Sequence, residues 1–400
     1  MEDTVLPLFF NSYLYLPKDP HIRNGFMEIL PGMFSNARVG SHLHTSTLAV
    51  AFFTVAAWAG QGSLLRASEA YFTGALPKIR EALMKDDDTD FETVLISILL
   101  LSTYEEFVAI KDWRNPMKAH LRGAIALINS KMPKTLEGPS SSTICNAVQT
   151  QIIKTTRGLA NPLVPTPKVW PLLQPTTPPS PRIFLSSTAS QLVQLRHDWE
   201  NTRFHGNNET EVKAILKRAM DIDVGLVSWT YWVPAHWVPE AATIIPQSVR
   251  NAGIYRNRCD CYVDMWIAST WNSYRDCRML VQSIIVSCLR MIPLDDPDGG
   301  RLAAATAVIQ KLADDVCATV PYFLGSQMES VRLKPGLVDY PYAETRPVTL
   351  THKQSAPLMG AWHIIAYLRN LQGPELGLPP EQVDWVERQM DRVLTIYFQR

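Results

Sequence analysis

The longest regular pattern in this sequence is an apolar stripe with helical spacing between residues 263 and 291. Its members step alternately by four and three residues, which places them on one face of a helix of about eight turns. Shorter stripes of the same kind recur along the chain, and alternation with a period of two is scarce. The sequence therefore predicts an all-α fold, a large multi-helix bundle-like domain. The stripe consists of Val263, Ile267, Thr270, Tyr274, Cys277, Val281, Ile284, Cys288 and Met291.

Residues 88–128 predict an antiparallel pair of helices. A capping-box pattern at Thr89 precedes a segment that is apolar on most faces, as expected for a helix in the centre of a large bundle. Asn115 and Pro116 then predict the start of a second helix, with a buried stripe that runs to Ile128. Later helices are predicted over 302–316, 356–372 and 383–397.

A proline-rich segment, residues 162–181, interrupts the helices. Its eight prolines remove backbone donors and prevent a continuous helix. The segment either separates two halves or wraps around one helical body, and we favour the second. We thus expect one domain over 1–400, with an N-terminal half (1–161), a long proline-rich loop (162–181) and a C-terminal half (182–400).

Charge and composition exclude several classes of protein. The 38 basic and 38 acidic residues cancel, so the chain as a whole does not attract a phosphate backbone. With 46% hydrophobic and 19% charged residues it has the composition of a folded globular protein. The apolar runs at 48–60 and 94–101 are shorter than a membrane span, and no signal peptide is visible. Six widely spread cysteines fit a reducing compartment.

The motifs of common enzymes are missing from the sequence. There is no Gly-rich dinucleotide loop, P-loop, zinc-protease helix, EF-hand loop or nucleophile elbow. Cys259-Asp260-Cys261 is one close cysteine pair, whereas a structural zinc site needs four ligands. We therefore expect no metal ion and no other cofactor.

Two groups of residues remain as candidates for function. Glu105 and His120, on the two helices of the predicted pair, are either an acid–base pair or the partners of a buried polar contact; we favour the second. An aromatic-rich segment at 228–240 and the helix that follows it supply tryptophans that could line a small-molecule pocket or pack in the core, and packing is the commoner role. The ligand-pocket candidates are Trp229, Trp232, Trp266 and Trp271.

Four segments, in order along the chain, resemble the fungal-specific transcription factor domain, the regulatory region of fungal zinc-cluster transcription factors. They are ASEAYFTGALPKIREAL (67–83), LLLSTYEEFVAIKDWRNPMKAHLRGAIALI (99–128), MWIASTWNSYRDCRMLVQSIIVSCL (265–289) and LADDVCATVPYFLG (312–325). In that family the matching positions belong to the helical regulatory body and are not catalytic, which implies that this chain is no enzyme. The matching positions include Tyr104, Glu105, Trp113, His120, Gly123, Arg275, Arg278 and Pro321.

The resemblance implies a nuclear transcription regulator of metabolic genes, including those of secondary metabolism. It would act through protein partners of the transcription machinery or a DNA-binding relative, or through a small effector, and it could form a homodimer. The family's six-cysteine zinc cluster is missing, since the first cysteine is Cys145, so we expect weak and non-specific DNA binding by this chain. The alternative is a helical biosynthetic accessory protein or enzyme that reuses the fold, and a chain of that kind would remain in the cytoplasm.

Overall fold

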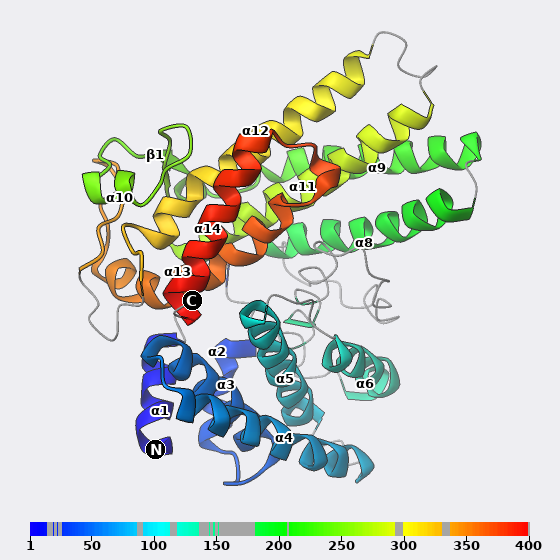
Figure 1. Ribbon diagram of the computed structural model, residues 1–400. Helices are drawn as coiled ribbons and strands as arrows, with labels where there is room; N and C mark the ends of the chain where they lie inside the picture. The colour runs from blue at the N-terminus through cyan, green and yellow to red at the C-terminus, as the bar shows by residue number, and fades with distance from the viewer. Residues whose placement is uncertain are drawn as a thin grey trace.

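The computed structural model describes residues 1–13, 19, 22, 26–85, 91–112, 118–135, 144, 147–148, 151, 181–205, 208–292, 299–329 and 337–398. Within these ranges the chain is mainly helical, so the predicted all-α fold is confirmed. Figure 1 shows the helices that precede residue 136 grouped below those that follow residue 180. The predicted loop 162–181 lies outside the described residues except for Pro181, and so do Thr89, Trp113, Asn115 and Pro116.

Two helices, α3 (His42–Ala59) and α5 (Phe91–Lys111), form the centre of the N-terminal half. The hydroxyl oxygen of Ser41 accepts a hydrogen bond from the backbone N–H of His44 at the start of α3. Gly60, with a φ of 61°, ends the same helix in the left-handed region that glycine adopts without strain. The surrounding elements are α1 (Glu2–Leu8), the π-helix η1 (Phe9–Tyr13), α2 (Phe26–Ser35), α4 (Gly62–Met84) and α6 (Ala119–Thr135).

By length and composition, α5 is apolar enough to cross a membrane, which the short apolar runs of the sequence did not suggest. In the structure α5 packs against α2, α3, α4 and α6, and most of its side chains are buried. A core helix of a globular protein has this property, because all its faces meet other helices.

The second helix of the predicted pair begins later than the sequence pattern indicates. We expected its first turn at Pro116, but Lys118 has a φ of 58° and is therefore in the left-handed region. A residue in that conformation cannot belong to a right-handed helix. The expected start was wrong, and α6 begins at Ala119.

The C-terminal half contains the long helices of the upper layer in Figure 1. They are α8 (Pro181–His205), α9 (Glu209–Trp229), α11 (Met265–Met291), α12 (Gly300–Leu324), α13 (Leu350–Leu371) and α14 (Pro380–Phe398). Three short helical segments lie between them, namely η5 (Ala235–Trp237), α10 (Gln247–Asn251) and η7 (Pro374–Leu376). A two-residue antiparallel ladder joins β1 (Glu240–Ala241) to β2 (Asp260–Cys261).

The long stripe of the sequence corresponds to α11, which packs against α8, α9, α12 and α13. Asp264 caps the helix, since its Oδ1 accepts from the N–H of Trp266 at 2.6 Å. Val263 therefore precedes the helix and is exposed, contrary to its expected place in the stripe. Cys277 and Cys288 are buried and free, as small core residues should be.

At one point α12 and α13 approach each other at backbone distance. A Cβ atom added to Gly360 of α13 would lie 2.0 Å from the carbonyl oxygen of Phe323 of α12. Because that oxygen belongs to a helix backbone, it cannot move aside as a flexible side chain could. Gly360 is thus required by the helix packing and not by its own backbone conformation.

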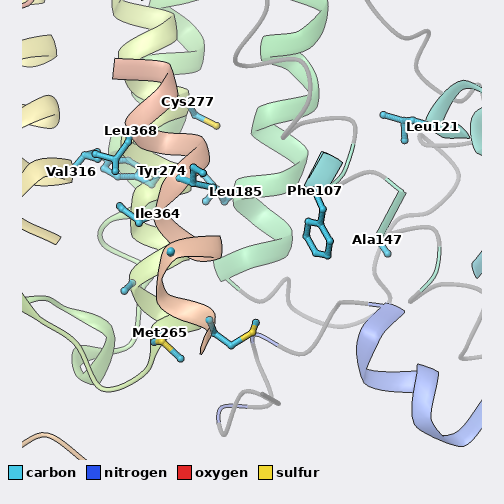
Figure 2. Close-up of a cluster of buried hydrophobic side chains, with 14 of the residues drawn as sticks. Phe107, Leu121, Ala147, Leu185, Met265, Tyr274, Cys277, Val316, Ile364 and Leu368 are labelled. Atoms are coloured by element: carbon cyan, nitrogen blue, oxygen red, sulfur yellow. The ribbon is translucent and has the colours of Figure 1, made fainter. Parts of the chain in front are cut away.

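A single cluster of buried hydrophobic side chains includes residues from both halves. The C-terminal helix α14 contacts α3. Phe107 of α5 lies with its ring centroid 4.1 Å from that of Trp362 of α13. Figure 2 shows part of this core, in which Leu185 of α8, Tyr274 of α11 and Ile364 of α13 are labelled. The two halves are therefore packed together through shared core side chains.

Candidate functional site

The structure brings Glu105 of α5 and His120 of α6 together. Nδ1 of His120 lies 2.9 Å from Oε1 of Glu105, and both side chains are largely buried. The geometry of this contact is not that of a hydrogen bond, and Oε2 of Glu105 has no hydrogen-bond partner either. The ring of His120 meets that of Phe72 edge-on at 5.7 Å. The contact is thus a close polar pair enclosed by α4, α5 and α6.

Around this pair we find no arrangement that would carry out a reaction. In the described part of the chain, no three His, Cys, Asp or Glu side chains are placed to hold a metal ion. Tyr104, the neighbour of Glu105, is used in packing, since its ring stacks on that of Phe72 at 4.5 Å. A Cβ atom on Gly123 would meet no atom within 4 Å, so this glycine is not required for close packing. The geometry supports the buried polar contact that we favoured.

An aromatic series connects this pair of helices to the C-terminal half. From Tyr104 the ring contacts lead to Phe53 of α3 at 5.4 Å and from there to Phe107 of α5 at 5.7 Å. Phe107 then contacts Trp362, whose ring meets that of Tyr397 of α14 at 4.6 Å. The same set of rings that supports the polar pair is therefore part of the contact between the two halves.

Two of the four candidate tryptophans, Trp229 and Trp271, lie together. Their ring centroids are 5.0 Å apart, and the ring of Tyr274 stacks on Trp229 at 4.9 Å. Both indole N–H groups donate to backbone carbonyls, Trp229 to Pro181 at 2.6 Å and Trp271 to Trp237 at 2.7 Å. Their polar atoms are thus already used within the protein.

The other two candidates lie elsewhere. Trp232 is 70% exposed, beyond the end of α9. Trp266 is in the first turn of α11, where its ring meets that of His363 edge-on at 4.8 Å and faces the guanidinium of Arg182 at 5.9 Å. The four tryptophans therefore do not line one common site, and a ligand pocket among them stays a prediction.

The family-like arginines of α11 hold carboxylates and hydroxyls. Arg278 donates from Nε to Oδ1 of Asp223 at 2.8 Å and from Nη1 to the hydroxyl of Tyr274 at 3.2 Å. Arg275, which is almost fully buried, donates from Nη1 to the hydroxyl of Tyr262 at 2.9 Å and to Oδ1 of Asn272 at 2.8 Å. Both arginines fix α11 to its neighbours.

Arg275 is part of a partly buried ion network that the sequence did not reveal. Its Nη2 lies 3.9 Å from Oδ2 of Asp260, which also binds Arg258 through two hydrogen bonds of 3.1 and 2.9 Å. Arg258 donates in addition to Asp315 at 2.6 Å. Burial opposes ionisation of Asp315, but Arg275, Lys311 and Arg258 outweigh it and lower its pKa. The network joins β2 to α11 and α12.

The two cysteines beside Asp260 lie in the core. Cys259 and Cys261 are buried, and burial raises the pKa of each thiol to about 12. The thiol of Cys261 donates to the carbonyl oxygen of Pro341 at 3.5 Å. Burial of both thiols fits the expectation of core cysteines.

The end of α12, which contains Pro321, is held by a second buried arginine. Arg392 of α14 donates to the carbonyl oxygens of Gln327 at 2.8 Å and Gly325 at 2.7 Å, among other acceptors. Burial lowers the pKa of Arg392 to about 10. A cation at the carboxyl end of a helix is favourable, because the last carbonyls carry partial negative charge. Sequence reasoning missed this residue, since nothing marks one arginine of an amphipathic helix as buried.

Comparison with known proteins finds similarity to one family. Residues 2–155 match the family described as "Fungal specific transcription factor domain". Over these residues the chain is similar to that domain. The chain is also similar to the transcription factor dbaG of Emericella nidulans, with 20% identity over 346 residues that cover 84% of this chain and 77% of that protein. No solved structure matches the chain.

The fungal transcription factor domain resemblance seen in the sequence is therefore confirmed. The matched range contains Tyr104, Glu105, His120 and Gly123 and thus the whole polar pair. The ion network around Arg275 lies beyond residue 155. Both the family and the relative's name are those of transcription factors and not of enzymes, so the protein is a transcription regulator.

Proposed function

We propose that this chain is the regulatory body of a fungal transcription regulator that controls metabolic genes, those of secondary metabolism among them. The observation that carries the proposal is the match of residues 2–155 to the fungal transcription factor domain. The similarity to the transcription factor dbaG, which extends over most of both chains, supports it. Membership in a family of transcription factors implies that the protein works in the nucleus.

We further propose that residues 1–400 act as one domain. The shared hydrophobic core and the contact between Phe107 and Trp362 support this, because the halves could not separate without exposing core side chains. A rigid helical body of this kind offers surfaces for the transcription machinery or for a DNA-binding relative. It can also bind a small effector that changes those contacts.

Deletion of the gene, followed by transcript profiling, tests the proposed function. We expect a coordinated change in the genes of one metabolic pathway, and restoration of their expression by the wild-type gene. An allele with Gly123→Ala should restore expression as well, because a side chain at that position meets no atom within 4 Å. A deletion strain without any coordinated change in transcripts would show that the proposal is wrong.

A further inference from the structure

The feature that leads furthest beyond the proposed function is Arg182, the second residue of α8. Its Nη1 donates to the carbonyl oxygen of Ile22 at 2.8 Å, and its guanidinium lies 5.9 Å from the ring centroid of Trp266. The side chain is half-buried and contacts Ile22 and, on α11, Trp266. This arginine thus connects the two halves of the molecule.

The environment of Arg182 is unfavourable for a positive charge. The amino end of a helix carries partial positive charge, so a cation in the first turn of α8 is repelled. Burial lowers the pKa of Arg182, while Glu28 and Tyr367 act in the opposite direction. Even so, no carboxylate of the described residues lies within ion-pair distance of this guanidinium.

Arg275, Arg278 and Arg392 differ from Arg182 in this respect. Arg275 and Arg278 meet carboxylates, and Arg392 donates to carbonyl and amide oxygens from all three of its nitrogens. For Arg182 the described residues supply one acceptor, the carbonyl of Ile22, so Nε and Nη2 remain available. These two groups form the planar pair of donors that binds a carboxylate through two parallel hydrogen bonds.

We propose that Arg182 binds the carboxylate of a small organic acid whose apolar part lies against Trp266. The single positive charge suits a monocarboxylate better than a doubly charged phosphate group. The aromatic rings of Trp266 and His363, 4.8 Å apart, favour an apolar body next to the carboxylate. The inference rests on the proposed function for its role, since such an acid would be the effector. Its position between the halves would let the ligand affect both.

Isothermal titration calorimetry on the purified full chain tests the site with benzoate as the probe. Benzamide has the same shape without the charge, acetate lacks the ring, and inorganic phosphate tests another kind of anion. We expect benzoate to bind at least about tenfold more tightly than each of the other three. Benzoate should also raise the melting temperature of the wild-type protein, because a ligand that binds the folded state stabilises it.

Matched variants locate the binding. Arg182→Gln should weaken benzoate binding by about tenfold or more, and Arg182→Lys by less, because lysine keeps the charge but not the paired donors. Arg203→Gln, which removes an exposed arginine from the other end of α8, should leave it unchanged. Trp266→Leu should weaken binding of benzoate more than binding of acetate. The melting temperature of Arg182→Gln should stay within about 2 °C of the wild type, because repulsion from the helix end is relieved.

Three results would overturn the proposal: no benzoate binding by the wild type, equal binding by Arg182→Gln, or equal or tighter binding of benzamide or phosphate. Failure of this inference is distinguishable from failure of the proposed function. If gene deletion changes transcripts but the protein binds no benzoate, the regulator stands and the effector site does not. If benzoate binds through Arg182 but no transcripts change, the site stands and the regulatory function does not.

Discussion

The two halves of this chain bury polar side chains in different ways. In the N-terminal half, Glu105 and His120 face each other as an isolated pair, and one carboxylate oxygen has no hydrogen-bond partner. In the C-terminal half, Asp260 is held by Arg258 and by the buried Arg275, each of which has further partners. Removal of Arg275 takes a fully buried cation and several hydrogen bonds out of the core, whereas removal of Glu105 or His120 breaks a single contact. We expect mutations to be much costlier in the second half.

The largest effect is expected for Arg275→Met. The change roughly keeps the volume of the side chain but leaves the hydroxyl of Tyr262 and Oδ1 of Asn272 without their donor in the core, and it removes one of the two cations beside Asp260. Breaking a buried charge pair in this way costs about 3–5 kcal/mol of unfolding free energy. Urea denaturation followed by circular dichroism measures the loss.

Arg256→Met is the matched control for that experiment. Arg256 is exposed and makes one ion pair with Asp314 at 2.8 Å. Exposed ion pairs contribute about 0–1 kcal/mol, so this variant should unfold almost as the wild type does. Similar losses in the two variants would contradict the expected difference between a buried and an exposed arginine.

The next largest change in unfolding free energy is expected on acidification, and it depends on His352. Its Nε2 donates to the carbonyl oxygen of Tyr322 at 3.0 Å, and burial lowers its pKa from 6.5 to about 4. Between these values the unfolded chain binds a proton that the folded chain does not. The unfolding free energy should therefore fall as the pH is lowered from 6.5 toward 4, by up to about 3 kcal/mol.

His352→Gln retains a donor for the carbonyl of Tyr322 but cannot titrate in this range. We expect this variant to lose less stability than the wild type between pH 6.5 and pH 4. Unfolding curves at a series of pH values would show the difference. If both proteins lose stability equally, other groups cause the acid sensitivity and the role given to His352 is wrong.

A smaller loss of unfolding free energy is expected for Gly360→Ala in the C-terminal half. The equivalent change at Gly123 in the N-terminal half should cause no loss. The methyl group added at Gly360 meets the backbone carbonyl of Phe323, and overpacking of this kind costs about 1–3 kcal/mol. Gly123→Ala in α6 meets nothing and should be neutral or stabilising by up to about 1 kcal/mol, because alanine favours the helix. Thermal unfolding of both variants compares the two sites directly. A destabilised Gly123→Ala protein would contradict the open space at that position.

What the sequence could predict also differs between the two halves, because local patterns are visible in a sequence and contacts between distant segments are not. Helical stripes are local, so the all-α fold and the long helix α11 could be read from the spacing of apolar residues. The contact between Glu105 and His120 could be predicted because both residues lie on one helical pair at adjacent positions. The start of α6 was missed, because a left-handed Lys118 breaks the rule that a proline marks the first turn.

The buried charges of the C-terminal half could not be predicted in this way. Asp260 drew attention as the middle of a cysteine pair, although its partners Arg258 and Asp315 are brought to it by the fold. A four-residue spacing between Lys311 and Asp315 was visible, but it is equally common on exposed helices. For Trp232, aromatic composition suggested a pocket, and the end of α9 instead leaves the side chain exposed. Contacts between distant segments need the tertiary structure.

The smallest loss of unfolding free energy is expected for substitutions in the pair of Glu105 and His120. Glu105→Leu and His120→Leu should each lower the unfolding free energy by about 1 kcal/mol, since each leaves one polar group without its partner. The double variant should lose less than the sum of the two, because replacing both partners by apolar groups removes the unpaired atom. A double-mutant cycle by urea denaturation measures this coupling, and Lys85→Leu, whose exposed ion pair with Glu81 lies outside the core, is the control. If either single variant keeps wild-type stability but fails to restore transcription in the deletion strain, the pair has a functional role. The N-terminal half would then contain a site of action and not just a buried contact.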